Sequence, residues 1–145
     1  MDNQLTSLDI SQNTALTYLS CWGNQLTSLD VSQNTALTEL SCISNQLTSL
    51  DLSQNTALKY FYCDYNQLTS LDLSQNTALK RLYCQGNQLT CLNVKNGNNI
   101  NLTDFWVKTN PNLSCIEVDD PTWSTQNWTA VNFNIDNGVT FSTDC

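Results

Sequence analysis

Seven cysteines are the most reactive side chains of this sequence, and four of them recur at one constant spacing, as Cys21, Cys42, Cys63 and Cys84. Thiols can form disulfides, bind a metal ion or act as nucleophiles. If these four lie on successive parallel strands, their Cβ atoms stand about 4.7–4.9 Å apart. That separation exceeds the ~3.5–4.5 Å of a disulfide. We therefore predict a structural ladder of reduced, buried cysteines.

A metal site or a catalytic centre on these thiols is not expected. Structural zinc needs four ligands that converge on one point, whereas a linear ladder offers each sulfur only its neighbours. The chain has no histidine, which removes the commonest general base and a common metal ligand. Cys91 has no basic partner in the sequence, so no nucleophile–base pair can be drawn. We predict that the protein is not an enzyme and uses no metal or cofactor.

The remaining three cysteines lie outside the ladder. Cys115 and Cys145 bracket the C-terminal tail, and we predict that they form a disulfide. The bond closes a loop of about thirty residues, which is worth ~3–4 kcal/mol. Cys91 replaces the serine of an L-T-S-L run, an outward position by alternation. We interpret it as a free surface thiol, with pairing to a tail cysteine as the open alternative.

The cysteine spacing belongs to a longer repeat, whose four copies occupy residues 3–23, 24–44, 45–65 and 66–86. A period of this length indicates a solenoid, in which each unit buries its apolar edge only against its neighbours. Degenerate copies continue through 87–118, where KNGNNIN contains a two-residue insertion. We divide the chain into a leucine-rich repeat solenoid at 2–118 and a C-terminal cap at 119–145.

Each unit consists of two halves that follow L-x-x-L-x-(L/V/I/C)-x-x-N, the core of the leucine-rich repeat pattern. Apolar residues alternate with the period of a strand, as around Leu40 and Cys42. We expect an all-β-rich solenoid of 21-residue coils, with a parallel sheet on the variable half and extended segments on the other arm. The expected inward ladders are Leu5/Leu26/Leu47/Leu68, Leu8/Leu29/Leu50/Leu71, Ile10/Val31/Leu52/Leu73, Leu16/Leu37/Leu58/Leu79 and Leu19/Leu40/Phe61/Leu82.

Asparagines form two further rows at the turns of the repeat. A buried amide can bind free backbone groups and connect one coil to the next. We assign these asparagines a structural role; a polar ligand site is the alternative. The rows are Asn24/Asn45/Asn66/Asn87 and Asn13/Asn34/Asn55/Asn76.

One face of the solenoid varies while the rest of the repeat is nearly constant. In the four copies NQLTSLDxSQNTAL changes at one aliphatic position, and almost all other differences fall in the last seven residues. Tyrosine, tryptophan and arginine dominate interface energetics, so this pattern favours a recognition surface. The alternative is that these positions vary by simple sequence drift on a solvated strand, where residues of high β-propensity are favoured. The candidate ligand-binding residues are Tyr18, Trp22, Glu39, Tyr60, Tyr62, Asp64, Arg81, Tyr83, Asp104 and Trp106.

Acidic residues also repeat on the invariant arm, at Asp9, Asp30, Asp51 and Asp72, each two residues from a serine on both sides. Stacked carboxylates repel one another unless donors satisfy them. We expect hydroxyl and backbone donors to do so, with a cation-binding strip as the alternative.

The tail after Val118 has the features of a cap. Asp120-Pro121 predicts the start of a short helix that ends near Asn127 or Trp128. Asp136-Asn137-Gly138 is a turn signal, followed by a last strand around Val139 and Phe141. Asp119, Asp120 and Asp136 lack the spacing of a calcium loop, so we assign them to capping and turns. Four aromatic residues are expected to cover the end of the core: Trp123, Trp128, Phe133 and Phe141.

Composition limits the partners. The 145 residues carry a net charge of −8, and only 12% of them are charged. Binding to nucleic acid or to an anionic membrane needs dense lysine and arginine, so neither is expected. No apolar run approaches the ~18–20 residues of a transmembrane helix. No signal peptide is recognised either.

The repeats and the tail resemble those of known bacterial surface proteins. The form L-x-x-L-x-C-x-x-N-x-L-x-x-L-D-L is similar to the cysteine-ladder repeats of internalin-type proteins. The end of the chain, LNVKNGNNINLTDFWVKTNPNLSCIEVDDPTWSTQNWT, resembles the run that closes the array in secreted leucine-rich repeat proteins of the Bacteroidetes, especially flavobacteria. The resemblance implies a secreted or outer cell-surface location and an interaction or adhesion role. It supplies no catalytic residues.

These observations lead us to expect a non-catalytic binding module that recognises a protein or a glycan with its aromatic face, as a monomer in solution. A structural spacer or assembly solenoid without a ligand of its own is the alternative, because near-identical copies would set its length. Ice binding is a minor alternative, suggested by threonines that recur at the same position of each copy, such as Thr6, Thr27, Thr48 and Thr69.

Overall fold

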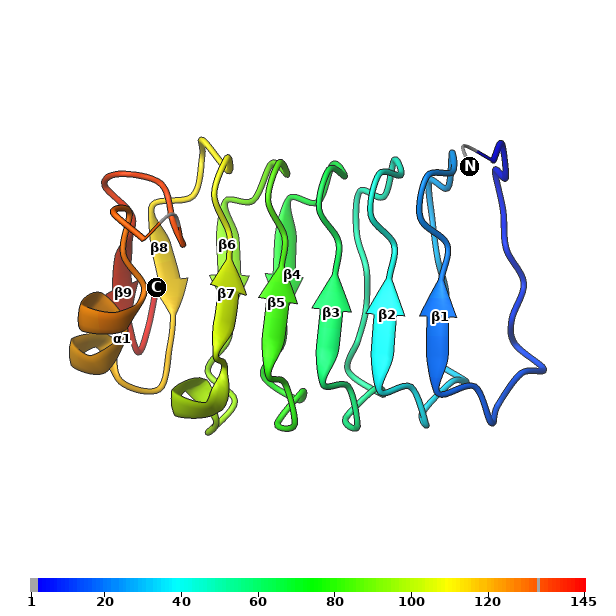
Figure 1. Ribbon diagram of the computed structural model, residues 1–145, viewed down its shortest axis with the longest axis horizontal. Coiled ribbons are helices and arrows are strands. Elements are labelled where there is room, and N and C mark those ends of the chain that lie inside the picture. The colour runs from blue at the N-terminus through cyan, green and yellow to red at the C-terminus, as the bar shows by residue number, and fades with distance from the viewer. Residues whose placement is uncertain (1–2, 133) are drawn as a thin grey trace.

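The computed structural model describes residues 3–132 and 134–145. Successive coils lie side by side along the long axis of the molecule, and each contributes a short strand to a parallel sheet (Figure 1). This first sheet contains β1 (Tyr18–Ser20), β2 (Glu39–Ser41), β3 (Tyr60–Tyr62), β5 (Arg81–Tyr83) and β7 (Asp104–Trp106).

The strand register reproduces the sequence period. Leu40 pairs with Phe61, and Phe61 pairs with Leu82, so each step advances by one full repeat. The last step, from Leu82 to Phe105, is longer by two residues. These additional residues lie near the 3-10 turn η1 (Asn99–Asn101), as the insertion in KNGNNIN predicts.

The opposite arm carries a second parallel sheet, where extended segments were expected. Its strands are β4 (Ser70–Asp72), β6 (Cys91–Asn93), β8 (Cys115–Glu117) and β9 (Thr140–Ser142). The sheet starts in the fourth copy and continues into the cap. Because β9 pairs with β8 in parallel, the tail of the chain extends the solenoid by one more rung.

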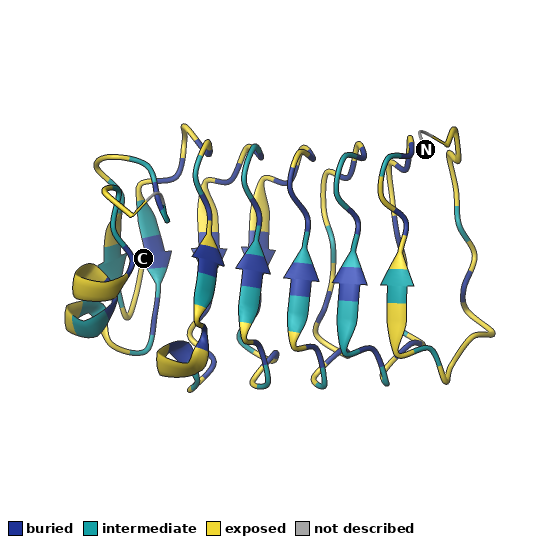
Figure 2. Ribbon diagram, viewed as in Figure 1, coloured by how far each residue is buried: buried dark blue, intermediate teal, exposed yellow. Residues whose placement is uncertain are grey.

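The core is the column of inward ladders between the two arms (Figure 2). The predicted ladder residues of copies two to four are buried, except that Leu50 is partly buried. The first coil has a neighbour on one side only. Leu5 is consequently 47% exposed, and Leu8, Leu16 and Leu19 are half-buried.

The C-terminal end of the core is covered by α1 (Pro121–Asn127) and the residues that follow it. The Asp120 side chain accepts hydrogen bonds from the backbone N–H groups of Thr122 and Trp123, at 2.9 and 3.0 Å. These bonds satisfy two of the free donors at the helix start, so the helix begins where the sequence predicts. Among the described residues no helix is long and apolar enough to cross a membrane.

Aromatic rings make up the inner surface of this cap. Trp128 stacks on Phe105 at a centroid distance of 4.0 Å, and both Trp123 and Phe141 contact Trp128. The predicted capping role of Phe133 lies outside the described residues.

Candidate binding face

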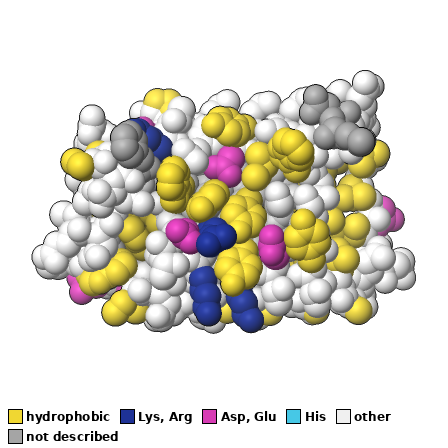
Figure 3. All heavy atoms as spheres, viewed as in Figure 1, with side chains coloured by type: hydrophobic (Ala, Val, Ile, Leu, Met, Phe, Trp, Pro, Cys, Tyr) yellow, Lys and Arg dark blue, Asp and Glu magenta, His cyan; other side chains and the backbone are white. Residues whose placement is uncertain are grey.

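The outward surface of the first sheet carries most of the candidate ligand-binding residues. Tyr18 and Trp22 are 56% and 50% exposed, and Trp106 is also exposed. Tyr60, Tyr62 and Tyr83 are half-buried: Tyr62 and Tyr83 lie against each other on neighbouring strands, and Tyr60 lies beside Arg81. Figure 3 shows the resulting band of hydrophobic side chains across this side of the solenoid, with acidic and basic groups between them.

The rings on β3, β5 and β7 form a continuous row. Tyr62 meets Tyr83 edge to face at a centroid distance of 5.2 Å, and Tyr83 meets Trp106 at 5.7 Å. Pairs with this spacing are favourable beyond the area that they bury. Burial in the row raises the pKa of Tyr83, and nearby Asp104 contributes in the same direction. The register that stacks the core leucines thus also aligns these rings.

Arg81 fixes the centre of the row. Its Nη1 donates to the hydroxyl oxygen of Tyr62 at 3.2 Å, and its Nε donates to Oδ2 of Asp104 at 2.8 Å. The guanidinium carbon lies 5.7 Å from the ring centre of Tyr60. The hydrogen bonds to Tyr62 and Asp104 raise the pKa of Arg81 above its already high ordinary value.

The ion pair of Arg81 and Asp104 is 40% and 38% exposed at its side chains, so it contributes little to stability. It holds the guanidinium and the neighbouring rings in one arrangement. Both residues were expected on this face from the sequence, and the structure adds that they bind each other.

Asp64 was expected on the outward face, and that expectation is wrong. The residue is only 5% exposed, and its Oδ1 accepts a hydrogen bond from the backbone N–H of Gln85 at 3.0 Å. Burial is the main reason that the pKa of Asp64 is raised. The carboxylate therefore joins two coils and is not exposed on the outward face. Glu39, by contrast, lies half-buried on β2 within the face.

Three further exposed residues were not predicted from the sequence: Tyr65, Lys59 and Lys80. Tyr65 occupies the last position of its copy and adopts a positive φ of 55°. Lys59 and Lys80 occupy the positions just before β3 and β5, where the first two copies have threonine. The only signal for them was variation between copies at these positions.

The asparagines at the turns form the predicted ladder. The Nδ2 of Asn66 donates to the carbonyl oxygens of Cys42 and Cys63 at 3.0 and 3.1 Å. Its Oδ1 accepts from the backbone N–H of Leu47 at 3.0 Å. Asn45 and Asn87 bind equivalent groups, whereas the Nδ2 of Asn24, the first residue of the row, donates to the carbonyl oxygens of Cys21 and Trp22 in its own turn. Asn110 continues the row in the degenerate copy.

The second row also connects coils. The Nδ2 of Asn55 donates to the carbonyl oxygens of Val31 and Asn34 at 3.1 and 2.9 Å. The Oδ1 atoms of Asn34, Asn55 and Asn76 are buried and have no hydrogen-bond partner among the described residues. Each amide therefore stabilises the stack through its nitrogen.

The cysteines occupy the three environments that the sequence predicts. Cys21, Cys42, Cys63 and Cys84 are buried and unpaired, while Cys115 and Cys145 form the disulfide. Burial raises the pKa of Cys21 to about 11 and raises that of Cys42 further. The thiols of Cys21 and Cys42 are therefore harder to ionise than an exposed thiol. Cys91 is free and exposed.

The acidic residues outside the face bind backbone groups. Oδ1 of Asp30 accepts from the backbone N–H of Ser32 at 2.9 Å, and this bond is the main reason that the pKa of Asp30 is lowered. Asp119 accepts from the N–H groups of Gly97 and Asn99. Among the described residues, no group of three or more histidine, cysteine or acidic side chains is arranged to hold a metal.

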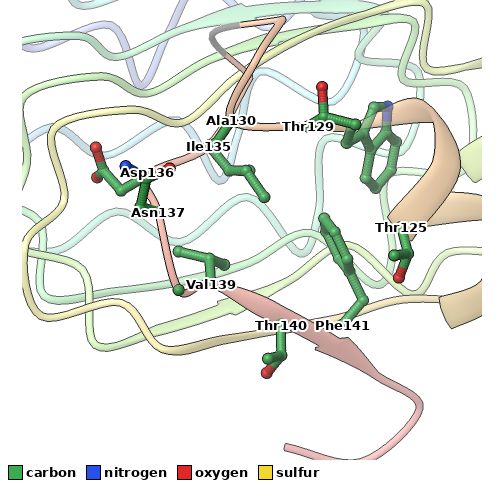
Figure 4. Close-up of a pocket in the computed structure, with 11 residues that line it drawn as sticks. Thr125, Thr129, Ala130, Ile135, Asp136, Asn137, Val139, Thr140 and Phe141 are labelled. Carbon is green, nitrogen blue, oxygen red and sulfur yellow. The ribbon is translucent and has the colours of Figure 1, made fainter.

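A cavity of about 350 Å³ lies at the C-terminal end, between α1 and β9. Ile135 and Phe141 point into it, whereas the carboxylate of Asp136 points away (Figure 4). Asp136 binds the backbone N–H of Asn110 at 2.8 Å, so it acts as a structural link. Among the described residues that line the cavity, Asp136 is the only one with an ionisable side chain.

No protein-family model and no curated protein sequence matched the chain. Among solved structures, the functional domain of InlJ from Listeria monocytogenes, which includes a cysteine ladder, covers 75% of this chain at 41% sequence identity with a TM-score of 0.66. A leucine-rich repeat protein of Leptospira interrogans covers 92% of it at 29% identity with a TM-score of 0.64. The chain spans 26% of the Listeria chain and 35% of the Leptospira chain. The chain therefore folds as a leucine-rich repeat solenoid similar to these two bacterial proteins, with a cysteine ladder of its own.

Proposed function

We propose that this solenoid is a non-catalytic binding module of a secreted or cell-surface bacterial protein, and that it binds another protein through the outward surface of its first sheet. We call this surface the aromatic face. It consists of Tyr18, Trp22, Glu39, Tyr60, Tyr62, Arg81, Tyr83, Asp104 and Trp106.

The continuous row of rings fixed by Arg81 is the observation that carries the proposal. Binding hot spots are enriched in tyrosine, tryptophan and arginine. Tyr62 and Tyr83 are already held by their mutual contact and by the hydrogen bond to Arg81, so little side-chain freedom is lost when a partner binds. The same residues exist in one arrangement before binding, which favours a protein partner of complementary shape.

Three further observations support the proposal. The copies differ almost only on this face, although the core and the other arm repeat with few changes. The similar solved structures are bacterial leucine-rich repeat solenoids, an architecture that offers an extended surface for binding. The disulfide fits an oxidising compartment outside the cytoplasm. The flavobacterial type of the protein is inferred from the resemblance of its tail alone.

The test uses substitutions that the chain itself contains. Tyr62, Tyr83 and Trp106 occupy the position that is serine in the first two copies, Ser20 and Ser41. The triple variant Y62S/Y83S/W106S removes the row of rings with side chains that the fold accepts. The matched control is Q33A/Q54A/Q75A, which changes three exposed residues of the invariant arm.

Both variants and the unmodified protein are probed against displayed bacterial and host surface-protein domains, and against a glycan array. We expect protein hits whose affinity falls at least about tenfold, or ~1.4 kcal/mol, in the serine variant and is retained in the control. Equal binding by all three proteins would overturn the proposal. Hits confined to the array, and lost in the serine variant, would replace the protein partner by a glycan.

The spacer alternative makes a different prediction for the same experiment. A spacer has no face of its own, so no displayed domain or glycan would distinguish the serine variant from the control. A difference in binding between the serine variant and the control therefore distinguishes the proposed binding module from a spacer.

A further inference from the structure

The exposed thiol of Cys91 lies on the rung beside the disulfide of the cap. The register of β6 and β8 pairs Leu92 with Ile116. Cys91 and Cys115 each precede these inward residues by one position, so they face outward on directly neighbouring strands. Such strands are about 4.7–4.9 Å apart. The free thiol and one sulfur of the disulfide therefore share one edge of the second sheet.

The tail carries the other sulfur toward the same place. The Nζ of Lys95, just after β6, donates to the carbonyl oxygen of Thr143 at 2.9 Å. The side chain of Lys95 thus reaches from the end of β6 past β8 to the segment that follows β9. Cys145, two residues further on, is exposed and bonds to Cys115 at a Cα–Cα distance of 6.0 Å.

We propose that Cys91, Cys115 and Cys145 form a thiol–disulfide exchange site, in which Cys91 takes over Cys145 from Cys115. The thiolate sulfur of Cys91 attacks Sγ of Cys145, and a new bond forms between these two sulfurs. The Cys115–Cys145 bond breaks, and its electron pair leaves on Sγ of Cys115. Cys115 then takes up, through solvent, the proton that Cys91 released. One disulfide and one thiol are present before and after, so no oxidant or reductant is consumed.

Geometry selects Cys145 as the sulfur that is attacked. Cys91 and Cys115 belong to neighbouring parallel strands, whose Cβ atoms stay near the strand spacing and beyond the ~3.5–4.5 Å of a disulfide. Cys145 lies after the end of β9 and belongs to no strand. It can move from one rung to the next without disturbing the sheet. The four ladder cysteines are buried on the inner side and take no part.

The exchange would give the cap two alternative disulfide linkages, which we call its two closures. In the first, the tail is bonded to β8, the strand next to it; in the exchanged form, it is bonded to β6 and reaches across β8. The thiol that remains free changes from the exposed Cys91 to the half-buried Cys115. The site thus determines which thiol the protein presents to its surroundings.

Tryptic peptides distinguish the two closures. Cleavage after Arg81 and Lys95 releases fragment 82–95, which contains Cys91. Cleavage after Lys108 releases fragment 109–145, which contains both Cys115 and Cys145. In the first closure the disulfide lies within 109–145. In the exchanged form it joins 82–95 to 109–145.

The experiment incubates the folded protein without reductant at pH 8, quenches it with acid, blocks free thiols and maps the linkages by mass spectrometry. We expect the joined fragments, with Cys115 blocked as a thiol, in about a tenth or more of the molecules, which corresponds to ~1.4 kcal/mol or less between the two closures. The matched control is Cys91→Ser, since the regular copies have serine at this position (Ser7, Ser28, Ser49 and Ser70). It should give only the disulfide within 109–145.

Two more variants make the result decisive. Cys84→Ser removes the other cysteine of fragment 82–95 and should leave the joined fragments unchanged. Cys115→Ser removes the leaving group, so mild oxidation should join Cys91 to Cys145 directly. The proposal is overturned if the joined fragments are absent from the unmodified protein, or if Cys145 stays a free thiol in oxidised Cys115→Ser.

Discussion

The ring of Tyr65 lies directly over Gly86 of the next coil, so that a Cβ atom added at Gly86 would come within 2.7 Å of Cδ1 of Tyr65. The two residues occupy the same position in successive copies, and both have positive φ angles, 55° and 64°. The turn therefore imposes a left-handed backbone on every copy, and it also brings the side chain of one copy onto the backbone of the next.

This relationship predicts that Gly86→Ala is destabilising for two separable reasons. The left-handed backbone costs a non-glycine residue about 1–2 kcal/mol, and the contact with Tyr65 adds to that cost. Gly97→Ala is the matched control, because Gly97 has a φ of 76° and no atom within 4 Å of an added Cβ. Urea unfolding should show a larger loss for Gly86→Ala, and Tyr65→Gly should remove the excess. Equal losses at both glycines would contradict the steric part.

The asparagine ladder predicts that replacing an asparagine by alanine destabilises the protein more in the middle of the stack than near its N-terminal end. Asn66→Ala leaves a backbone N–H and the carbonyls of two coils without their partner, each at a cost of about 1–3 kcal/mol. We expect a total loss of roughly 3 kcal/mol or more. Asn24 binds one carbonyl fewer, and Leu5 is 47% exposed, so water can replace the bond to its N–H; Asn24→Ala should therefore cost about 1 kcal/mol. Denaturant midpoints with unchanged slopes measure the difference, and equal losses would show that the bond from Asn66 to the carbonyl of the preceding coil contributes nothing.

The cysteine ladder predicts a loss of stability at alkaline pH. The folded pKa of Cys21, about 11, lies above the ordinary value of 9.0, and that of Cys42 is raised further. The unfolded chain therefore releases these protons first, so the stabilisation is complete below the ordinary pKa and decreases as the pH rises toward the folded pKa. Each such thiol contributes a slope of about 1.4 kcal/mol per pH unit.

Cys42→Ala isolates this slope. Above the ordinary thiol pKa, the stability of the variant should fall less steeply than that of the unmodified protein, by about 1.4 kcal/mol per pH unit. Tyrosine and lysine titration affects both proteins equally. Urea unfolding in the presence of reductant at three alkaline pH values provides the comparison. Parallel pH profiles would mean that the thiol of Cys42 ionises as readily in the folded protein as in the unfolded chain.

The cap predicts that Trp128 holds the C-terminal end of the core. Trp128 is 3% exposed and stacks on Phe105, so Trp128→Ala should cost about 3–5 kcal/mol. Hydrogen exchange should show the largest loss of protection around Phe105 and Ile116, near the C-terminal ends of the two sheets. Trp22→Ala, at a residue that is 50% exposed, is the control and should change stability by about 0.5 kcal/mol or less.

Much of the fold follows from the sequence because one period repeats. Near-identical copies must advance by the same number of residues, so Leu40, Phe61 and Leu82 have to meet on successive strands. The same argument predicted the reduced cysteine ladder, since parallel rungs cannot bring their Cβ atoms close enough for a disulfide. The cap helix was predictable from Asp120-Pro121, because its start depends on local hydrogen bonds.

Only the tertiary structure shows the side-chain contacts between neighbouring copies at positions where the copies differ in residue type. Asp64 follows the outward alternation in sequence, but its carboxylate reaches the N–H of Gln85 and becomes buried. Arg81 and Asp104 belong to different copies and were both expected on the outward face, but only the folded side chains show that they form an ion pair. The register of β6 and β8 likewise places Cys91 on the strand beside Cys115 of the disulfide. A period determines which positions stack, whereas the partner that each side chain binds depends on atoms supplied by the neighbouring coil.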